Sequence, residues 1–176
     1  MDLADRSSRE SQTGDRVLID PSGRYMTLEI FEGIITVIPI IHPVKKRGKA
    51  ALAAAADDAP QIGELGEPTM SRIDELFVRS SAFLHVESKA PPRLALLHED
   101  NQKVVRLKVR ELHYTSSTSS TSAEASFGKE EVFAQELDLG AFHLIPVPAP
   151  LGRSFLSFCL RLNGQWSIFY RNTERS

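Results

Sequence analysis

The chain has 176 residues and a formal net charge of −2, and 41% of its residues are hydrophobic and 25% charged. These values suit one domain with a real core and argue against broad electrostatic capture of nucleic acid or acidic membranes. A single cysteine, Cys159, excludes an internal disulfide and a zinc site built from thiolates.

The first fifteen residues are polar, mixed in charge and without apolar periodicity. We therefore expect a disordered tail over 1–15 and a folded region over 16–176. The tail lacks the apolar segment of a secretory signal. No apolar run in the chain approaches the roughly 20 residues that a membrane helix needs, and no membrane association is predicted.

The stretch Gly23 to Ile40 predicts a β-hairpin around which the rest of the chain is organised. Apolar residues at 26, 28 and 30 alternate with Thr27 and Glu29, which indicates a strand with one buried apolar face and one polar face. Glu32-Gly33 offers a tight turn. The β-branched run at 34–38 has apolar residues on both faces, so this second strand should lie deep in a sheet.

Two regions have the composition of surface inserts. The first, at about 42–68, holds a basic cluster at 45–49, an alanine run and several Pro and Gly residues. A nuclear localisation role for the basic cluster is the alternative to a solvated loop. The second, at about 115–129, is a low-complexity Ser/Thr-rich loop. Between them, 70–84 has both a capping-box pattern and β-rich character, and we favour a strand from about Leu76 onward.

Further hairpins follow. Arg93–His98 and Val104–Arg110 are predicted to pair across the polar turn at 99–102. In the second arm, Arg106, Lys108 and Arg110 share one face. They could form a phosphate-binding row, but a solvated strand face is favoured because no aromatic residues alternate with the cations. Strands are expected at 132–139 and 142–147.

The strongest two-residue hairpin signal in the chain is Asn163-Gly164. It lies between the apolar stretches 154–162 and 166–170, which are predicted to pair as strands.

No catalytic, metal or cofactor constellation emerges from the sequence. The five histidines are scattered, at 42, 85, 98, 113 and 143, and no nucleophile elbow, Walker loop or dinucleotide fingerprint occurs. Cys159 lies in an apolar strand, as an inert thiol does. Glu99-Asp100 and Glu130-Glu131 are neighbours on strands or turns, where side chains diverge. The sequence therefore predicts no catalytic, cofactor-binding or metal residues and no cofactor, leaves the binding residues unknown, and indicates a binding scaffold, not an enzyme.

Many short strands, several hairpins and little helix predict an all-β fold: a sandwich, a barrel or part of a propeller. With blades of roughly 40–45 residues, the chain would hold two to four of them, too few for a ring of its own. A small β-barrel enzyme or ligand carrier is a further alternative, but the low-complexity inserts and the lack of convergent polar residues argue against it.

Five stretches resemble one family and occur in its order. They are residues 20–40 (DPSGRYMTLEIFEGIITVIPI), Glu75-Leu76 with Phe83-Leu84, PRLALLHEDNQKVVRLKV at 92–109, LIPVPAPLGR at 144–153, and SIFY at 167–170. They resemble the first β-propeller of the family that includes the large subunit of the damaged-DNA-binding complex and the large subunits of pre-mRNA cleavage and splicing complexes. The loops at 41–68 and 115–126 are longer than the family pattern, and Arg153 replaces a second glycine.

The resemblance implies an incomplete WD40-like propeller with long disordered loop insertions. It also implies a noncatalytic scaffold that, in the damage-binding member, adapts a cullin-RING ubiquitin ligase to DNA repair in the nucleus. Expected partners are other proteins, namely substrate receptors and the remaining propellers of a longer chain, with any nucleic-acid contact indirect. The alternative is a subunit of a pre-mRNA cleavage or splicing complex with RNA-related binding. No partner-contact residue carries over, because the matching motifs are turns and blade cores.

Overall fold

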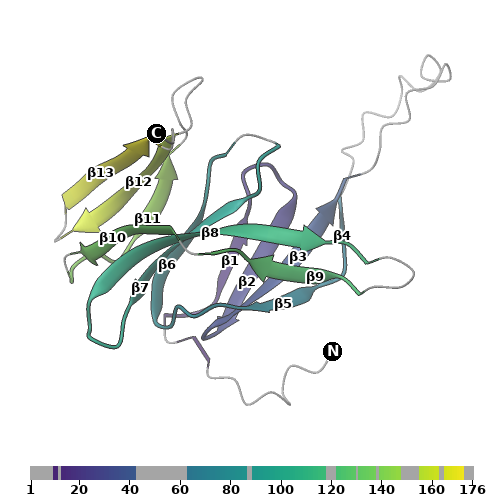
Figure 1. The fold of residues 1–176 in the computed structure, drawn as a ribbon, viewed down its shortest axis with the longest axis horizontal. Coiled ribbons are helices and arrows are strands. Elements are labelled where there is room, and N and C mark those ends of the chain that lie inside the picture. The colour runs from purple at the N-terminus through teal and green to yellow at the C-terminus, as the bar shows by residue number, and fades with distance from the viewer. Residues whose placement is uncertain are drawn as a thin grey trace.

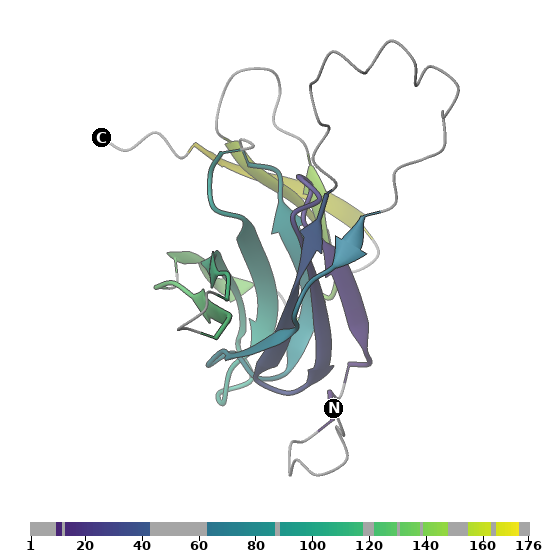
Figure 2. The same ribbon diagram turned by 90° about the vertical axis from the view of Figure 1, so that its right-hand side faces the viewer.

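The computed structural model consists of three antiparallel β-sheets arranged one after another in chain order (Figures 1 and 2). It describes residues 10–11, 13–42, 63–86, 89–117, 122–129, 131–137, 139–147, 155–162 and 165–172. Every regular element in this part of the chain is a strand. The predicted all-β class is therefore confirmed.

The first sheet is built on the predicted central hairpin. Its strands are β1 (Arg16–Ile19), β2 (Tyr25–Phe31), β3 (Ile34–Ile41), β4 (Glu64–Leu65) and β5 (Thr69–Arg72). β2 pairs with β3, and β3 pairs on its other edge with both β4 and β5. The strand that was expected to lie deep in a sheet is thus an interior strand, as its β-branched residues favour.

The second sheet has the order β10-β8-β7-β6, with β9 paired to β8. Its strands are β6 (Val78–Leu84), β7 (Arg93–Glu99), β8 (Val105–Thr115), β9 (Glu124–Phe127) and β10 (Glu131–Leu137). β7 and β8 form the predicted second hairpin, with register from Glu99↔Val105 to Arg93↔Glu111. β8 is long enough to pair with β10 along its first half and with β9 along its second.

The third sheet contains β11 (Leu144–Val147), β12 (Phe155–Leu162) and β13 (Gln165–Asn172) in that order. β12 and β13 pair along their whole length, with Leu162 opposite Gln165. The predicted pairing of these two strands is therefore confirmed, while Asn163 and Gly164 between them lie outside the described residues.

The sheets are arranged as the blades of a propeller. β6, the edge strand of the second sheet, contacts β1 of the first sheet and β11 of the third. Each sheet ends in a connection to the edge strand of the next sheet (Figure 1). Three sheets arranged in this way form part of a ring, which confirms the expected incomplete propeller.

The second sheet is buried on both faces. One face carries Phe83, Leu94 and Leu96, which pack with Ile35 and Val37 of the first sheet. The other face carries Leu84, Ala95, Leu97, Val105 and Leu107, which pack with Ala141 and Leu144 at the start of the third sheet. Strands buried on both faces have continuous rather than alternating apolar sequence, which explains the run Leu94–Leu97.

One prediction about β2 is wrong. Thr27 and Glu29, assigned to a solvated face, are only 0% and 5% exposed, whereas Met26, Leu28 and Ile30 are half-buried. The reason is that the face of the first sheet that carries Thr27 and Glu29 packs on the second sheet. We call it the inner face and the opposite one the outer face. Alternation in the sequence identified two faces correctly but not which of them the second sheet covers.

The regions assigned to loops and tail contain some ordered structure. β4 lies within the insert expected at 42–68, and β9 lies within the low-complexity loop expected at 115–129. Glu10 in the expected tail forms a bridge with Phe31. Ser11 N–H donates to the Ile30 carbonyl at 2.9 Å. The basic cluster at 45–49 lies outside the described residues. The ambiguous stretch 70–84 holds the end of β5 and all of β6, which begins at Val78, with a non-strand connection at 73–77 between them. Ser71 pairs with Ile35 in the ladder instead of capping a helix.

Candidate functional site: an ionic joint between two sheets

A fully buried carboxylate occupies the connection from the first sheet to the second. We call residues 73–77 the first crossover. Its Glu75 is 1% exposed. The Arg110 guanidinium holds both Glu75 oxygens, with Nε 3.1 Å from Oε1 and 3.0 Å from Oε2, and Nη2 2.9 Å from Oε1. Lys108 Nζ lies 3.4 Å from Oε1. Two cations therefore oppose one desolvated anion.

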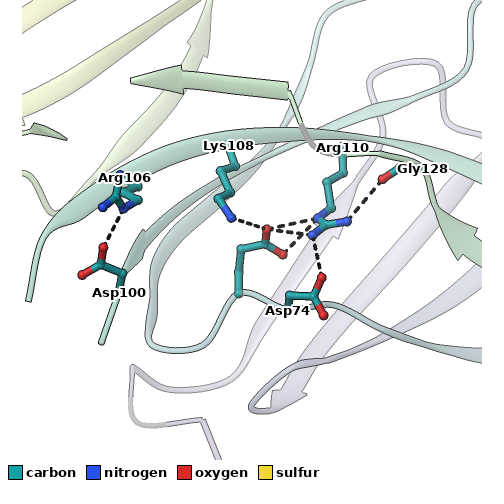
Figure 3. A network of polar contacts seen from close by, with 7 residues as sticks. Asp74, Asp100, Arg106, Lys108, Arg110 and Gly128 are labelled. Atoms are coloured by element: carbon teal, nitrogen blue, oxygen red, sulfur yellow. Dashed lines mark hydrogen bonds and ion pairs between the residues drawn. The ribbon is translucent and has the colours of Figure 1, made fainter. Parts of the chain in front are cut away.

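Alternation along β8 places both cations on the same face. Lys108 and Arg110 are two residues apart on a strand, so their side chains extend toward the same carboxylate (Figure 3). Arg110 also donates to the Gly128 carbonyl at 3.2 Å and contacts Asp74 Oδ2 at 3.3 Å. One guanidinium thus joins the first crossover, β8 and the segment after β9. Its planar donor set makes this possible, and a lysine could not replace it.

Backbone contacts fix the first crossover at both of its ends. Ile73 N–H donates to the Gly33 carbonyl at 3.0 Å, and Phe77 N–H donates to Glu32 Oε2 at 2.9 Å. Phe77 has φ 51°, an outlier for a bulky residue, which the contacts on both sides hold in place. The turn at 32–33 and the first crossover are therefore one packed unit.

An arginine also holds the second crossover, residues 139–143, which leads into the third sheet. Arg79 Nη1 donates to the backbone carbonyls of Leu139 and Ala141, at 2.6 and 3.1 Å. Its Nη2 contacts Glu99. Ser80 Oγ accepts the N–H of Leu144 at 3.1 Å, where β11 begins.

The turn Asp20–Gly23 between β1 and β2 is held by the side chain of its first residue. The buried Asp20 carboxylate accepts the backbone N–H of Ser22 at 3.0 Å and of Arg24 at 2.8 Å. Gly23 has φ 68°, a conformation that glycine adopts freely. Arg24 Nη2 donates to the Ala90 carbonyl at 2.8 Å, in the connection between β6 and β7. This turn is therefore a second tie between the first two sheets.

The basic row predicted on β8 is paired with carboxylates of the same chain instead of forming an open solvated face. Arg110 is 8% exposed, and each cation of the row has an acidic partner. Arg106 Nε donates to Asp100 Oδ2 at 2.6 Å, while Lys108 and Arg110 contact Glu75. The favoured solvated face is wrong for Arg110, because Glu75 enters from the first crossover and pairs with both Arg110 and Lys108.

The paired carboxylates of the β7–β8 turn act as edge and turn charges, as expected. Hydrogen bonds from Lys103 and then Arg79 lower the pKa of Glu99. The N–H of Val104 and then the Arg106 side chain lower the pKa of Asp100. Both carboxylates therefore form hydrogen bonds and ion pairs at the β7–β8 turn. Glu131 begins β10, and Glu130 lies outside the described residues.

The predicted histidines do not converge. Within the described residues no group of three His, Cys, Asp or Glu side chains could hold a metal ion. His42 contacts the Gly23 carbonyl at 2.7 Å, whereas His85, His113 and His143 are exposed. His98 is 5% exposed; burial and then the Lys108 charge lower its pKa, against the weaker effects of Glu75 and Asp100.

Cys159 lies on β12, and its side chain is outside the described residues. No helix in the part of the chain that the structure describes is long and apolar enough to cross a membrane.

Comparison with known proteins identifies the family. A family model described as the RSE1/DDB1/CPSF1 first beta-propeller matches residues 1–176. The chain belongs to this family. The family accounts for the three-blade arrangement and agrees with the resemblance inferred from the five ordered motifs.

Among similar proteins is DNA damage-binding protein 1 of Schizosaccharomyces pombe, 32% identical over 112 residues, which cover 64% of this chain and 9% of the relative. DNA damage-binding protein 1b of Arabidopsis thaliana is 29% identical over 150 residues, 85% of this chain and 11% of the relative. DNA damage-binding protein 1 of Oryza sativa subsp. japonica is 29% identical over 151 residues, which cover 86% of this chain and 11% of the relative. The match thus spans a small part of these relatives' length.

Proposed function

We propose that the chain is part of a noncatalytic protein-interaction scaffold of the DNA damage-binding protein 1 type. The observation that carries the proposal is the match of the first-propeller family model to the whole chain, residues 1–176. It is supported by the ionic groups of the β5–β6 and β7–β8 regions, which contact one another instead of lining a reaction site. The proposed role is that of a cullin-RING ubiquitin ligase adaptor acting in DNA repair in the nucleus.

The proposal includes ring closure. On the outer face of the first sheet, Val17 and Ile19 are 61% and 60% exposed, and Met26, Leu28 and Ile30 are half-buried. The second sheet buries comparable residues on both of its faces. In a longer chain, a further blade would cover this outer face. Burial of such side chains contributes roughly 1.5–3 kcal/mol each, so the isolated chain 1–176 should self-associate through surfaces of this kind.

A co-purification experiment tests the function. The full-length gene product, used as bait, should recover a cullin scaffold subunit and its RING partner. A second bait without residues 1–176 should retain the cullin, which the family resemblance assigns to another propeller, but lose the proteins that bind the first. A full-length bait that recovers no cullin component but recovers RNA-processing subunits would support the pre-mRNA alternative instead.

A further inference from the structure

Two buried oxygen atoms between the first and second sheets have no hydrogen-bond partner. Thr27 Oγ1 and Glu29 Oε1 both lie on the inner face of β2, where the two residues are 0% and 5% exposed. The other oxygen of the same carboxylate is well satisfied. Glu29 Oε2 accepts from Arg16 Nε at 2.9 Å and from Ser81 Oγ at 2.8 Å. The unsatisfied groups are thus confined to one side of Glu29.

The strand geometry places the two residues next to each other on one face of β2. Residues 27 and 29 share a face of β2, and their Cα atoms are roughly 6.8 Å apart at about 3.4 Å per residue. The side chains extend from neighbouring positions on that face. The two oxygens do not bond to each other directly, so a molecule that makes a hydrogen bond of roughly 2.8 Å to each of them would satisfy both. The flanking ladder partners of Thr27 are Leu18 and Val37, which offer only apolar side chains.

The chemistry of the pair defines the ligand. The threonine hydroxyl can donate and accept, whereas a carboxylate oxygen only accepts. Arg16 already balances the Glu29 charge, so the site calls for a neutral molecule that both donates and accepts. A cation would need more oxygen ligands than these two. Leaving both oxygens dry would carry the full desolvation penalty of each group.

We propose that an ordered water molecule occupies the interface between the first and second sheets and bridges Thr27 Oγ1 and Glu29 Oε1. Buried waters of this kind are part of a folded structure and satisfy polar groups that no side chain reaches. The water completes a polar strip in which Arg16, Glu29 and Ser81 join β1, β2 and β6. This strip explains why the face of β2 with Thr27 and Glu29, rather than its apolar face, is directed at the second sheet.

The test is the pair of variants Thr27→Val and Thr27→Ser in the full chain that carries this propeller. Valine has the shape of threonine but no hydroxyl, whereas serine keeps it. With a bridging water, Thr27→Val should raise the unfolding equilibrium constant about fivefold. Thr27→Ser should raise it less than Thr27→Val does, because serine keeps the hydroxyl that binds the water. Without the water, Thr27→Val removes an unsatisfied hydroxyl and should lower that constant instead.

High-resolution density distinguishes the remaining outcomes. A peak within hydrogen-bonding distance of both oxygens, lost in Thr27→Val and kept in a Ser81→Ala control, would support the water, because Ser81 bonds the other carboxylate oxygen. Density without such a peak would overturn the proposal. So would a peak that gains scattering when rubidium replaces the monovalent ions of the buffer. If Thr27→Val does not fold, the density of the unmodified chain still decides between these outcomes.

Discussion

The two crossovers are both held by an arginine, but the groups that the arginines hold differ. In the first crossover, Arg110 binds the carboxylate of Glu75, which is 1% exposed. In the second, Arg79 binds backbone carbonyls, one of them on Leu139, which is 65% exposed. Solvent can replace the arginine at an exposed carbonyl, whereas Glu75 is shielded from bulk solvent and would keep an uncompensated charge. The first joint should therefore tolerate loss of its arginine far less well than the second.

The largest effect is expected for Arg110→Met. This change removes the guanidinium from the buried Glu75 carboxylate and leaves the longer contact with Lys108, and breaking a buried ion pair typically costs about 3–5 kcal/mol. The free energy of unfolding from urea titrations would measure the loss. Arg106→Met is the matched control on the same strand. It should lower the free energy of unfolding much less, because its partner Asp100 still accepts the backbone N–H groups of Gln102 and Val104.

A double variant sharpens this prediction. Replacing both members of the pair, as Glu75→Leu with Arg110→Met, removes the uncompensated charge, so the double variant should be more stable than Arg110→Met alone. If the double variant loses the sum of the two single losses, the two side chains act independently and the joint is not a coupled ion pair.

Arg79→Met should have a smaller effect of about 1–2 kcal/mol. It removes two hydrogen bonds to carbonyls and one ionic contact, but Glu99 keeps Lys103 at 2.8 Å. Unfolding midpoints measured beside those of Arg110→Met would test the comparison directly. A loss equal to or larger than that of Arg110→Met would mean that the type of group held by the arginine does not decide the strength of a joint.

The strands were largely predictable from sequence, whereas the ionic joint was not. Local alternation and turn residues identified both β2–β3 and β7–β8, because hairpin pairing depends on neighbouring residues. Glu75 lies in the five-residue first crossover, outside any hairpin pattern, and its partner Arg110 is 35 residues away. A contact of that kind follows from how the sheets stack, and a single sequence carries no local signal of the stacking.

The same reasoning explains the two errors on strand faces. Thr27 and Glu29 have the residue types of a solvated face, and so does Arg110. Glu29 and Arg110 are buried because polar groups from another sheet or crossover bond to them: Ser81 bonds Glu29, and Glu75 bonds Arg110. Thr27 is buried with Glu29 because the two residues share the inner face of β2.

Gly33→Ala tests whether the β2–β3 turn and the first crossover are one unit. Gly33 has φ 71°, and a Cβ there would lie 3.1 Å from Leu76 Cδ2 and 3.3 Å from the Ile73 carbonyl oxygen. Left-handed backbone alone costs a residue with a Cβ about 1–2 kcal/mol. Gly14→Ala is the control, since it shares the positive φ but has no atom within 4 Å. A larger loss at Gly33 than at Gly14, measured by urea unfolding, would demonstrate the packing between turn and crossover.

The smallest effect concerns pH and the charges around the first joint. His98 faces Lys108, Glu75 and Asp100 and has no partner at Nε2, and burial lowers its pKa below the ordinary 6.5. Below pH 6.5 the unfolded chain binds a proton that folded His98 resists, so stability should fall on acidification from pH 8 to 5.5. For one proton the slope is at most about 1.4 kcal/mol per pH unit.

The lowered pKa values of Glu99 and Asp100 place their titration below this window. His98→Phe should therefore flatten the pH dependence of the urea midpoint between 8 and 5.5, and an unchanged slope in that variant would mean that another group takes up the proton.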